Sequence, residues 1–262
     1  MTDRVKGKSI LITGASSGIG EACARRFAAG GADLILTARR EDRLLRLKEA
    51  LEKDHGVTVR TRRLDVRDRK AVEVFSGEVE REIEAPDVLV NNAGLASGIG
   101  KFYQGDFDDW DKMIGTNVTG LLNVTRYIVP LMVKRNRGHI VNIGSVAGHM
   151  VYPGGNVYNA TKFAVRALNQ AMNIDLVGTR IRVSSIDPGA VETEFSIVRY
   201  HGDKERAKAV YGGFEPLTGD DIAEAVYFVV NAPEHVNIVN MVVLPTAQRS
   251  PYVLHREEGR GK

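Results

Sequence analysis

The chain has 262 residues, of which 43% are hydrophobic, with one cysteine and a formal net charge of +3. This length suits one α/β domain with a single large core. The single cysteine, Cys23, excludes an intramolecular disulfide, and the small net charge does not favour nucleic acid as a partner. No apolar run approaches 18 residues and no signal-peptide pattern opens the chain, so we predict a cytoplasmic protein that does not span a membrane.

Strand and helix patterns alternate along the chain. The strand candidates are rich in β-branched and apolar residues and cover 9–13, 33–38, 57–64, 87–92, 139–145, 180–187 and 237–244. Helical candidates cover 19–30, 41–53, 68–83, 106–136, 156–178 and 220–231, and Thr218 with Asp221 has the spacing of a cap for the last helix. We predict an α/β Rossmann fold: one doubly wound parallel sheet of about seven strands, helices on both faces, in a single domain over 1–262.

Two segments do not follow this alternation. Residues 190–217 form a long connection before the last helix, and long connections at the carboxyl edge of such a sheet are usually lids or binding loops. Residues 245–262 form a polar tail without a hydrophobic period. We expect the tail either to fray or to pack on a neighbouring subunit.

A glycine-rich turn, TGASSGIG, joins the first strand to the first helix over residues 13–20. Glycines allow a sharp turn and let backbone N–H groups and the helix N-terminus approach a pyrophosphate. The spacing is G-x-x-x-G-x-G, not the common G-x-G-x-x-G fingerprint. With a strand before it and a helix after it, the turn predicts dinucleotide binding.

The end of the second strand discriminates between two nicotinamide cofactors. Enzymes that use NAD place an acidic side chain there for the ribose 2′-OH, whereas this strand ends in Thr37-Ala38-Arg39-Arg40. An arginine suits a 2′-phosphate, which its guanidinium can bind through two hydrogen bonds. We therefore predict NADP(H), with Arg39 as the main partner. Arg40 has the alternative role of a surface arginine that opens the next helix.

Tyr158 and Lys162 stand four residues apart in VYNATKFAV, downstream of Ser145. On a helix this spacing places both side chains on one face, with Cβ atoms about 5–6 Å apart. A free phenol titrates at about pH 10, and an adjacent ammonium favours the phenolate, so the pair predicts a general acid/base. Tyr200 and Lys204 have the same spacing, but they lie in a polar stretch with no strand-end serine before them, where we expect a solvated pair.

Further motifs occur in the order of a known family. Asp65-Val66 follows the third strand, the NNAG segment 91–94 follows the fourth, and Pro188-Gly189 with Thr193 follows the sixth. Together with TGASSGIG and the residues around Tyr158, these motifs make the chain resemble the short-chain dehydrogenase/reductases along its whole length.

The resemblance implies a catalytic tetrad of Ser145, Tyr158, Lys162 and Asn117. Tyr158 would deliver a proton to a carbonyl oxygen, or accept it in reverse, while hydride passes from or to nicotinamide C4. Lys162 would lower the pKa of Tyr158 and hold the nicotinamide ribose. Ser145 would bind the substrate oxygen, and Asn117 would bind a water that links Lys162 to solvent.

The cofactor contacts predicted from the turn, from the second strand and from the resemblance form one set, and no metal site is expected. They are Gly14, Ser16, Ser17, Gly18, Ile19, Gly20, Arg39, Arg40, Asp65, Val66, Asn92, Ala93, Gly94, Tyr158, Lys162, Pro188, Gly189, Val191 and Thr193.

A narrower resemblance concerns the substrate. Residues 155–166, 191–211 and 244–251 are similar to the NADP-dependent 3-hydroxy acid dehydrogenases. This implies small 3-hydroxy acids as substrates: serine, allo-threonine, or 3-hydroxypropionate and malonic semialdehyde. A broad carbonyl reductase or alcohol dehydrogenase is the alternative. A cofactor-sensing binding protein is disfavoured, because a sensor has no need to keep Tyr158 and Lys162 together.

A 3-hydroxy acid also needs a partner for its carboxylate. The segment 190–217 offers four cations, and we select Arg199, since it lies closest to Thr193; the tail offers a competitor, Arg249. The other three are Lys204, Arg206 and Lys208. The long helices carry wide apolar stripes, such as Leu121, Leu122, Val124 and Ile128, and the family resemblance implies that they pair across subunits in a homotetramer.

Overall fold

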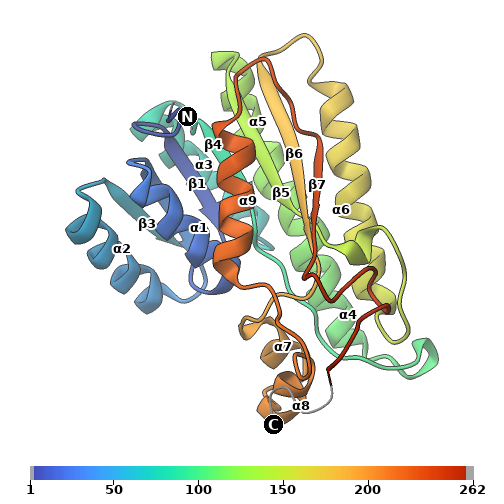
Figure 1. Ribbon diagram of the computed structural model, residues 1–262. Coiled ribbons are helices and arrows are strands. Elements are labelled where there is room, and N and C mark those ends of the chain that lie inside the picture. The colour runs from blue at the N-terminus through green and yellow to red at the C-terminus, as the bar shows by residue number, and fades with distance from the viewer. Residues whose placement is uncertain (1–2, 258–262) are drawn as a thin grey trace.

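Seven parallel strands form one sheet in the order β3-β2-β1-β4-β5-β6-β7 (Figure 1). The computed structural model describes residues 3–257. The strands are β1 (Ser9–Thr13), β2 (Asp33–Ala38), β3 (Val59–Arg63), β4 (Val88–Asn91), β5 (Gly138–Ile143), β6 (Ile181–Pro188) and β7 (Asn240–Val243). The predicted doubly wound sheet is confirmed, with boundaries shifted by a few residues at β3 and β7.

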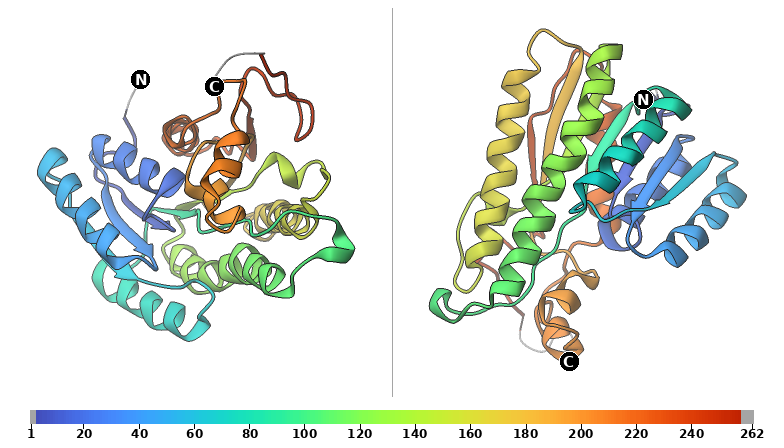
Figure 2. Two further views of the ribbon diagram at one scale, coloured as in Figure 1. Left: turned by 90° about the horizontal axis from the view of Figure 1, so that it is seen from below. Right: turned by 180° about the vertical axis from the view of Figure 1, so that it is seen from behind.

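Helices cover both faces of the sheet, as the two views of Figure 2 show. On one face lie α1 (Gly18–Ala29), α2 (Glu41–His55) and α9 (Gly219–Asn231), and on the other lie α3 (Arg69–Ile83), α5 (Leu121–Arg135) and α6 (Asn156–Asp175). The shorter helices are α4 (Phe107–Ile114), α7 (Glu194–Arg199) and α8 (Lys204–Ala209). Thr218 is the N-cap of α9, and its side chain forms the predicted capping box with Asp221.

The alternation of side chains along β1 shows how one strand serves two cores. Ile10 and Ile12 pack with α1 and α9, whereas Leu11 between them packs with α3 and α5. Successive side chains of a strand point to opposite faces, so a strand covered on both sides has to be apolar throughout. Cys23 on α1 is fully buried in the first core, and burial raises the pKa of its thiol to about 12. Its role is packing.

The helix predicted over 106–136 is found as an unbroken helical run over 107–135, but it is not α-helical throughout. A π-helical turn at Gly115–Gly120 separates α4 from α5, and such turns are frequent at functional sites. The stripe predicted for subunit contacts is also mostly internal. Leu121, Val124 and Ile128 are buried in the chain's own core, and of the four only Leu122 is exposed, at 43%.

The connection 190–217 is not without regular structure, because it contains α7 and α8. Its two ends meet in a bridge between Val191 and Leu217, which closes the segment into a unit below the sheet (Figure 1). We call residues 190–217 the α7–α8 segment.

The described part of the tail, 245–257, packs on its own chain, so the expectation that it frays is wrong for these residues. Gln248 Oε1 accepts a hydrogen bond of 2.9 Å from the backbone N–H of Ala190. Arg256 donates to the carbonyls of Val210 and Gly212. The tail therefore covers the α7–α8 segment of the same molecule; residues 258–262 lie outside the described residues. Within residues 3–257, no helix has the length and apolar character needed to cross a bilayer.

Candidate active site

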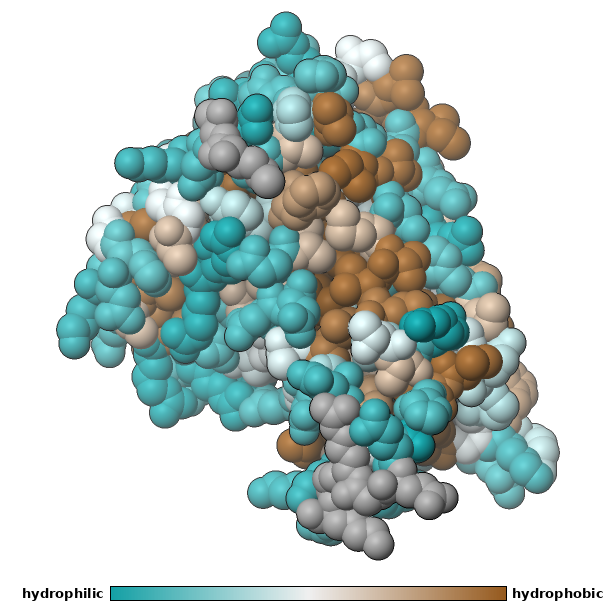
Figure 3. All heavy atoms as spheres, viewed as in Figure 1, coloured by the Kyte–Doolittle hydropathy of each residue, from teal (hydrophilic) through white to brown (hydrophobic). Residues whose placement is uncertain are grey.

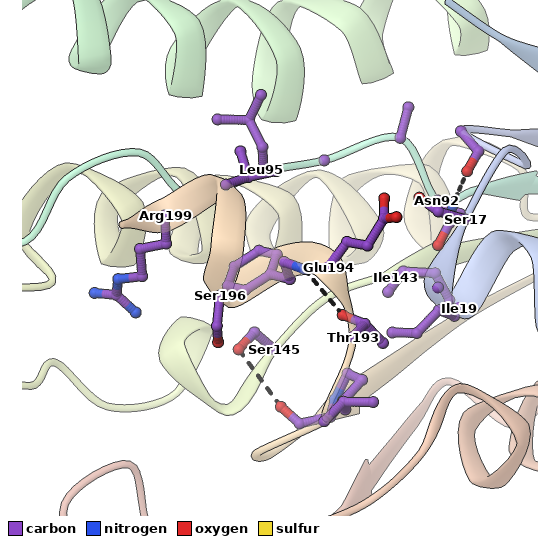
Figure 4. Close-up of a pocket in the computed structure, with 18 of the residues that line it drawn as sticks. Ser17, Ile19, Asn92, Leu95, Ile143, Ser145, Thr193, Glu194, Ser196 and Arg199 are labelled. Carbon is purple, nitrogen blue, oxygen red and sulfur yellow. Dashed lines mark hydrogen bonds between the residues drawn. The ribbon is translucent and has the colours of Figure 1, made fainter. Parts of the chain in front are cut away.

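A cavity of about 480 Å³ lies at the carboxyl ends of the strands, between the sheet and the α7–α8 segment. Ligands of open α/β sheets bind at this edge, where the strand order reverses between β1 and β4. Apart from Gly20 and Asn117, every site residue predicted from the sequence lines this cavity. Figure 4 shows how these side chains come from the turn after β1, from β4, β5 and β6, and from α7.

The glycine-rich turn packs tightly against the loop that follows β4. Gly14 has a left-handed φ of +68°, and a Cβ atom there would lie 2.9 Å from Ala93 Cα. A Cβ at Gly20 would lie 2.4 Å from the amide nitrogen of Asn92, which donates to the carbonyl of Thr13 at 2.8 Å. Gly20 therefore shapes the turn from behind and does not line the cavity.

The start of α1 has the features of a phosphate site. Its N-cap, Ser17, makes no side-chain hydrogen bond to the helix. The first backbone N–H groups of α1, at the positive end of the helix dipole, can therefore donate to a ligand. The Ser17 hydroxyl instead accepts a hydrogen bond of 2.5 Å from Arg40. An uncapped helix start beside two arginines suits a dinucleotide that carries an additional phosphate.

Arg39 and Arg40 both line the cavity, with different surroundings. Arg39 is exposed beyond the end of β2. Arg40 is the N-cap of α2, yet its guanidinium also binds Ser16 Oγ at 3.2 Å and Glu194 at 2.8 Å. Arg40 is therefore more than a surface arginine at the start of a helix, because it also connects the glycine-rich turn to α7.

Tyr158 lies in the first turn of α6, and its ring packs edge-on against Phe195 at 5.6 Å. Ser145, at the end of β5, faces the same region of the cavity (Figure 4). Burial raises the pKa of Tyr158, although a hydrogen bond with Ser145 and the charge of Arg199 act against that rise. Tyr158 is therefore held as a neutral phenol, suited to donating a proton.

Lys162 is buried one turn further along α6. Its ammonium donates a hydrogen bond of 2.9 Å to the carbonyl of Ile143 and lies 5.9 Å from the Tyr158 ring centroid. Burial lowers the pKa of Lys162 to about 8, and the charge of Asp187 acts against that fall. The expectation that Lys162 leaves Tyr158 with a lowered pKa is wrong for this geometry, because the burial of the phenol dominates.

Asn117 lies in the π-helical turn, behind the cavity wall. Its amide group exchanges two hydrogen bonds of 2.8 Å with the backbone of Leu95 and donates a third, of 3.0 Å, to Thr161. A Cβ at Gly94 would lie 3.3 Å from Asn117 Oδ1 and 3.8 Å from Lys162 Nζ. Asn117 thus fixes the loop after β4 close to Lys162, with both amide hydrogens donated and Oδ1 accepting one hydrogen bond.

Arg199, at the end of α7, lines the cavity together with Ser145 and Tyr158 (Figure 4). Its guanidinium carbon lies 5.3 Å from the Tyr152 ring centroid and 5.7 Å from that of Tyr158. Nε and Nη2 are buried, and neither has a hydrogen-bond partner among residues 3–257.

Tyr200 and Lys204, which have the same spacing as Tyr158 and Lys162, belong to two different helix ends and do not share a helix face.

Sequence reasoning missed several residues that line the cavity. Tyr152 and Phe195 flank Tyr158, and Tyr211 accepts or donates a hydrogen bond of 2.6 Å with Ser196. Gln248 reaches the cavity from the tail. An aromatic residue between Ser145 and Tyr158, and another two positions after Thr193, were usable signals for the first two. For Gln248 the signal was the similarity of residues 244–251 to the 3-hydroxy acid dehydrogenases.

Comparison with known proteins decides the family. Residues 8–203 match the family model described as short chain dehydrogenase. This chain belongs to the short-chain dehydrogenases. It is therefore an enzyme of a family that acts on hydroxyl groups with a nicotinamide cofactor.

Several relatives cover almost the whole enzyme. An NADP-dependent 3-hydroxy acid dehydrogenase of Salmonella typhi is 48% identical over 91% of this chain and 95% of its own. Sulfoacetaldehyde reductase 2 of Chromohalobacter salexigens is 45% identical over 91% of this chain and 94% of its own. The closed form of a serine dehydrogenase complexed with NADP⁺ superimposes with a TM-score of 0.88 at 43% identity, over 95% of this chain and 100% of that one.

Proposed function

We propose that this enzyme transfers hydride between NADP(H) and small 3-hydroxy acids or the corresponding 3-oxo acids. Its cofactor is NADP(H), in keeping with the relatives and with the arginines at the end of β2. Serine, allo-threonine and the pair 3-hydroxypropionate and malonic semialdehyde are the substrates proposed.

The observation that carries this proposal is the guanidinium of Arg199. Two of its nitrogens are buried without a partner among the described residues, beside the phenol and the hydroxyl proposed to hold the reacting oxygen. Buried N–H groups of a cation that lack a partner are costly, and a carboxylate is the ligand that best satisfies them. A hydroxy acid that places its hydroxyl at Tyr158 and Ser145 would bring its anion to Arg199.

The proposed roles of the tetrad follow from its surroundings. When bound, NADPH supplies the hydride for the carbonyl carbon. Tyr158 gives its phenolic proton to the carbonyl oxygen, which becomes the hydroxyl of the product. Ser145 donates a hydrogen bond to the same oxygen, and the ammonium of Lys162 stabilises the negative charge left behind. Oxidation reverses each of these steps.

The relatives suggest how far the anion can vary. Sulfoacetaldehyde and malonic semialdehyde both carry an anionic group on the carbon next to the aldehyde, so one cation at Arg199 suits either. A sulfonate aldehyde is thus a second candidate substrate. A broad carbonyl reductase, which needs no anion in its substrate, remains the alternative function.

The test compares Arg199→Ala with wild type on an anionic and a neutral substrate of similar size. We expect KM for L-serine or 3-hydroxypropionate to rise about 10- to 100-fold, and KM for a neutral alcohol to change far less, since only the acid loses a charge-assisted hydrogen bond. Lys208→Ala is the matched control, because it removes an exposed cation from the same segment. The ratio of kcat/KM for malonic semialdehyde to that for sulfoacetaldehyde then shows whether the enzyme prefers a carboxylate or a sulfonate.

Equal losses on charged and neutral substrates would remove Arg199 from the proposal and leave Arg249. That competitor is exposed and donates to the carbonyls of Thr246 and Gln248 in its own tail. A wild-type enzyme that prefers neutral aldehydes would favour the broad carbonyl reductase.

We also propose a cytoplasmic homotetramer. Figure 3 shows apolar side chains gathered over the sheet edge near β7, where Val239 and Val242 are exposed together with Phe228 of α9. Ile174 and Val177, at the end of α6, are exposed at 72% and 82%. Apolar patches of this kind mark contact surfaces. Light scattering after size exclusion gives the mass, and a monomer would contradict the proposal.

A further inference from the structure

Three polar side chains from three separate segments meet beside Arg199. Ser97 follows β4, Asp109 belongs to α4, and His201 lies in the turn after α7. Ser97 Oγ donates to Asp109 Oδ1 at 2.6 Å, and His201 Nε2 lies 3.0 Å from Asp109 Oδ2. We call Ser97, Asp109 and His201 the clasp. A second cavity, of about 250 Å³, is lined by the clasp and by Arg199.

The carboxylate at the centre of the clasp is buried, with only 9% of its side chain exposed. Burial alone would raise the pKa of Asp109, but the Ser97 hydroxyl and the charge of His201 outweigh it and lower that pKa. Lys112 adds a weaker contact at 3.7 Å. A buried carboxylate needs such partners, and breaking the contact with His201 would leave Asp109 with the Ser97 hydroxyl and the weaker contact with Lys112.

The clasp acts on the end of α7 through two links. The imidazole of His201 holds the turn to α4, and the backbone N–H of Gly98, next to Ser97, donates to the carbonyl of Arg199 at 2.9 Å. Gly98 has a left-handed φ of +70°, and a Cβ there would lie 2.6 Å from Asp109 Oδ2. The backbone of Arg199 is thereby fixed to the loop that follows β4.

His201 closes α7 in a left-handed helix cap. Its φ is +53°, in a region where histidine is more common than most residues other than glycine. The backbone N–H groups of His201 and Gly202 donate to the carbonyls of Val198 at 3.1 Å and Ile197 at 2.8 Å, the hydrogen-bond pattern of a helix C-terminus. The contact with Asp109 then ties this cap to α4.

We infer that His201 is a positioning residue for the substrate anion: through Asp109 it fixes the end of α7, and so places the guanidinium of Arg199 at the active-site cavity. This rests on the role proposed for Arg199. Nε and Nη2 of the guanidinium have no partner among the described residues, so its position depends on the backbone that carries it, on the aromatic rings beside it and on a hydrogen bond with the Tyr152 hydroxyl.

A matched pair of substitutions isolates the contact. The amide nitrogen of glutamine reaches about as far as Nε2 of histidine, whereas that of asparagine reaches only as far as Nδ1. Asparagine also tolerates the left-handed backbone. His201→Asn therefore removes the contact with Asp109 while keeping the turn, and His201→Gln keeps the contact.

We expect His201→Asn to raise KM for 3-hydroxypropionate about tenfold, because a small displacement of a positioned group is costly. Its kcat, its Kd for NADPH and its KM for a neutral alcohol should stay within about twofold of wild type, and His201→Gln should restore KM for the acid. In an Arg199→Ala background, His201→Asn should add nothing further, since a residue that acts only through Arg199 has no effect once Arg199 is gone.

The outcomes separate this inference from the proposed function. If Arg199→Ala raises KM for acids and for neutral alcohols equally, Arg199 does not bind the carboxylate, and the inference fails with that role. If Arg199→Ala is selective but His201→Asn behaves as wild type, only the inference is overturned. Equal losses on acids and neutral alcohols in both His201 variants, or weakened NADPH binding, would also overturn it, because they indicate a general structural role.

Discussion

The two sides of the active-site cavity are built differently. The cofactor side consists of strand ends and of a turn that packs so closely that a Cβ at Gly14 would lie 2.9 Å from a neighbouring backbone. The proposed substrate side is the α7–α8 segment, two six-residue helices held to the rest of the chain by contacts such as Arg40 with Glu194, His201 with Asp109 and the backbone of Gly98 with that of Arg199.

This difference teaches where substrate selectivity can be changed. The cofactor side shares its backbone with the core, so a change there affects every substrate. The α7–α8 segment can change one side chain at a time without disturbing the sheet, and loops on a rigid scaffold carry specificity for this reason. The predictions below, from the largest effect to the smallest, test whether the two sides are separable.

Tyr158→Phe should abolish turnover on acids and neutral alcohols alike. The ring and its packing against Phe195 remain, and only the transferable proton is lost, so kcat should fall by about 10²–10⁴-fold while Kd for NADPH stays nearly unchanged. Tyr200→Phe is the control, because this tyrosine also stands four residues before a lysine. A Tyr158→Phe enzyme with more than a tenth of the wild-type kcat would contradict the assignment.

Arg39→Asp should invert the cofactor preference toward NAD(H) and leave the order of substrates intact. The change removes a partner of the 2′-phosphate and supplies a carboxylate for the 2′-OH, and hydrogen bonds to charged groups are worth about 10- to 100-fold. The measurement is the ratio of kcat/KM for the two cofactors. Arg46→Asp, on the exposed face of α2, is the control; an unchanged ratio would assign the phosphate to Arg40.

The pH dependence should follow Lys162. Burial lowers its pKa to about 8, so the ammonium is present below that pH and is lost above it. We expect kcat/KM for NADPH to be level below about pH 7 and to fall about tenfold per unit well above pH 8, since this parameter reports the free enzyme. The profile should have the same shape whether the second substrate is malonic semialdehyde or a neutral aldehyde. A level profile up to pH 10 would mean that Lys162 keeps its proton.

Thr218→Ala should lower the stability without changing selectivity. The substitution removes the side chain that caps α9 directly after the α7–α8 segment. Losing such a cap costs about 1 kcal/mol, or about 2–4 °C in Tm for a chain of this size. The measurement is thermal unfolding beside KM values for an acid and an alcohol. A selective change in KM for the acid would show that the end of the segment also sets the position of Arg199.

The fold and most of the cavity lining could be predicted from the sequence because they depend on local patterns. The apolar run Ile10-Leu11-Ile12 indicates a strand buried on both faces, and the glycine spacing after it indicates the turn. Tyr158 and Lys162 are related by one helical turn. Prediction was poorer in the tail, since nothing in its polar composition indicates that Gln248 hydrogen-bonds to Ala190.

By itself, then, the sequence determined the strand and helix order, the glycine-rich turn, the arginines after β2 and the spacing of Tyr158 and Lys162, because each of these features depends on residues close together in the chain. Only the tertiary structure decided which groups meet from afar. His201 reaches Asp109 across 92 residues, and Arg40 reaches Glu194 across 154. The tertiary structure also decided that the pKa of Tyr158 is raised, because burial depends on the whole fold. The spacing from Tyr158 to Lys162 indicates only that an ammonium is nearby.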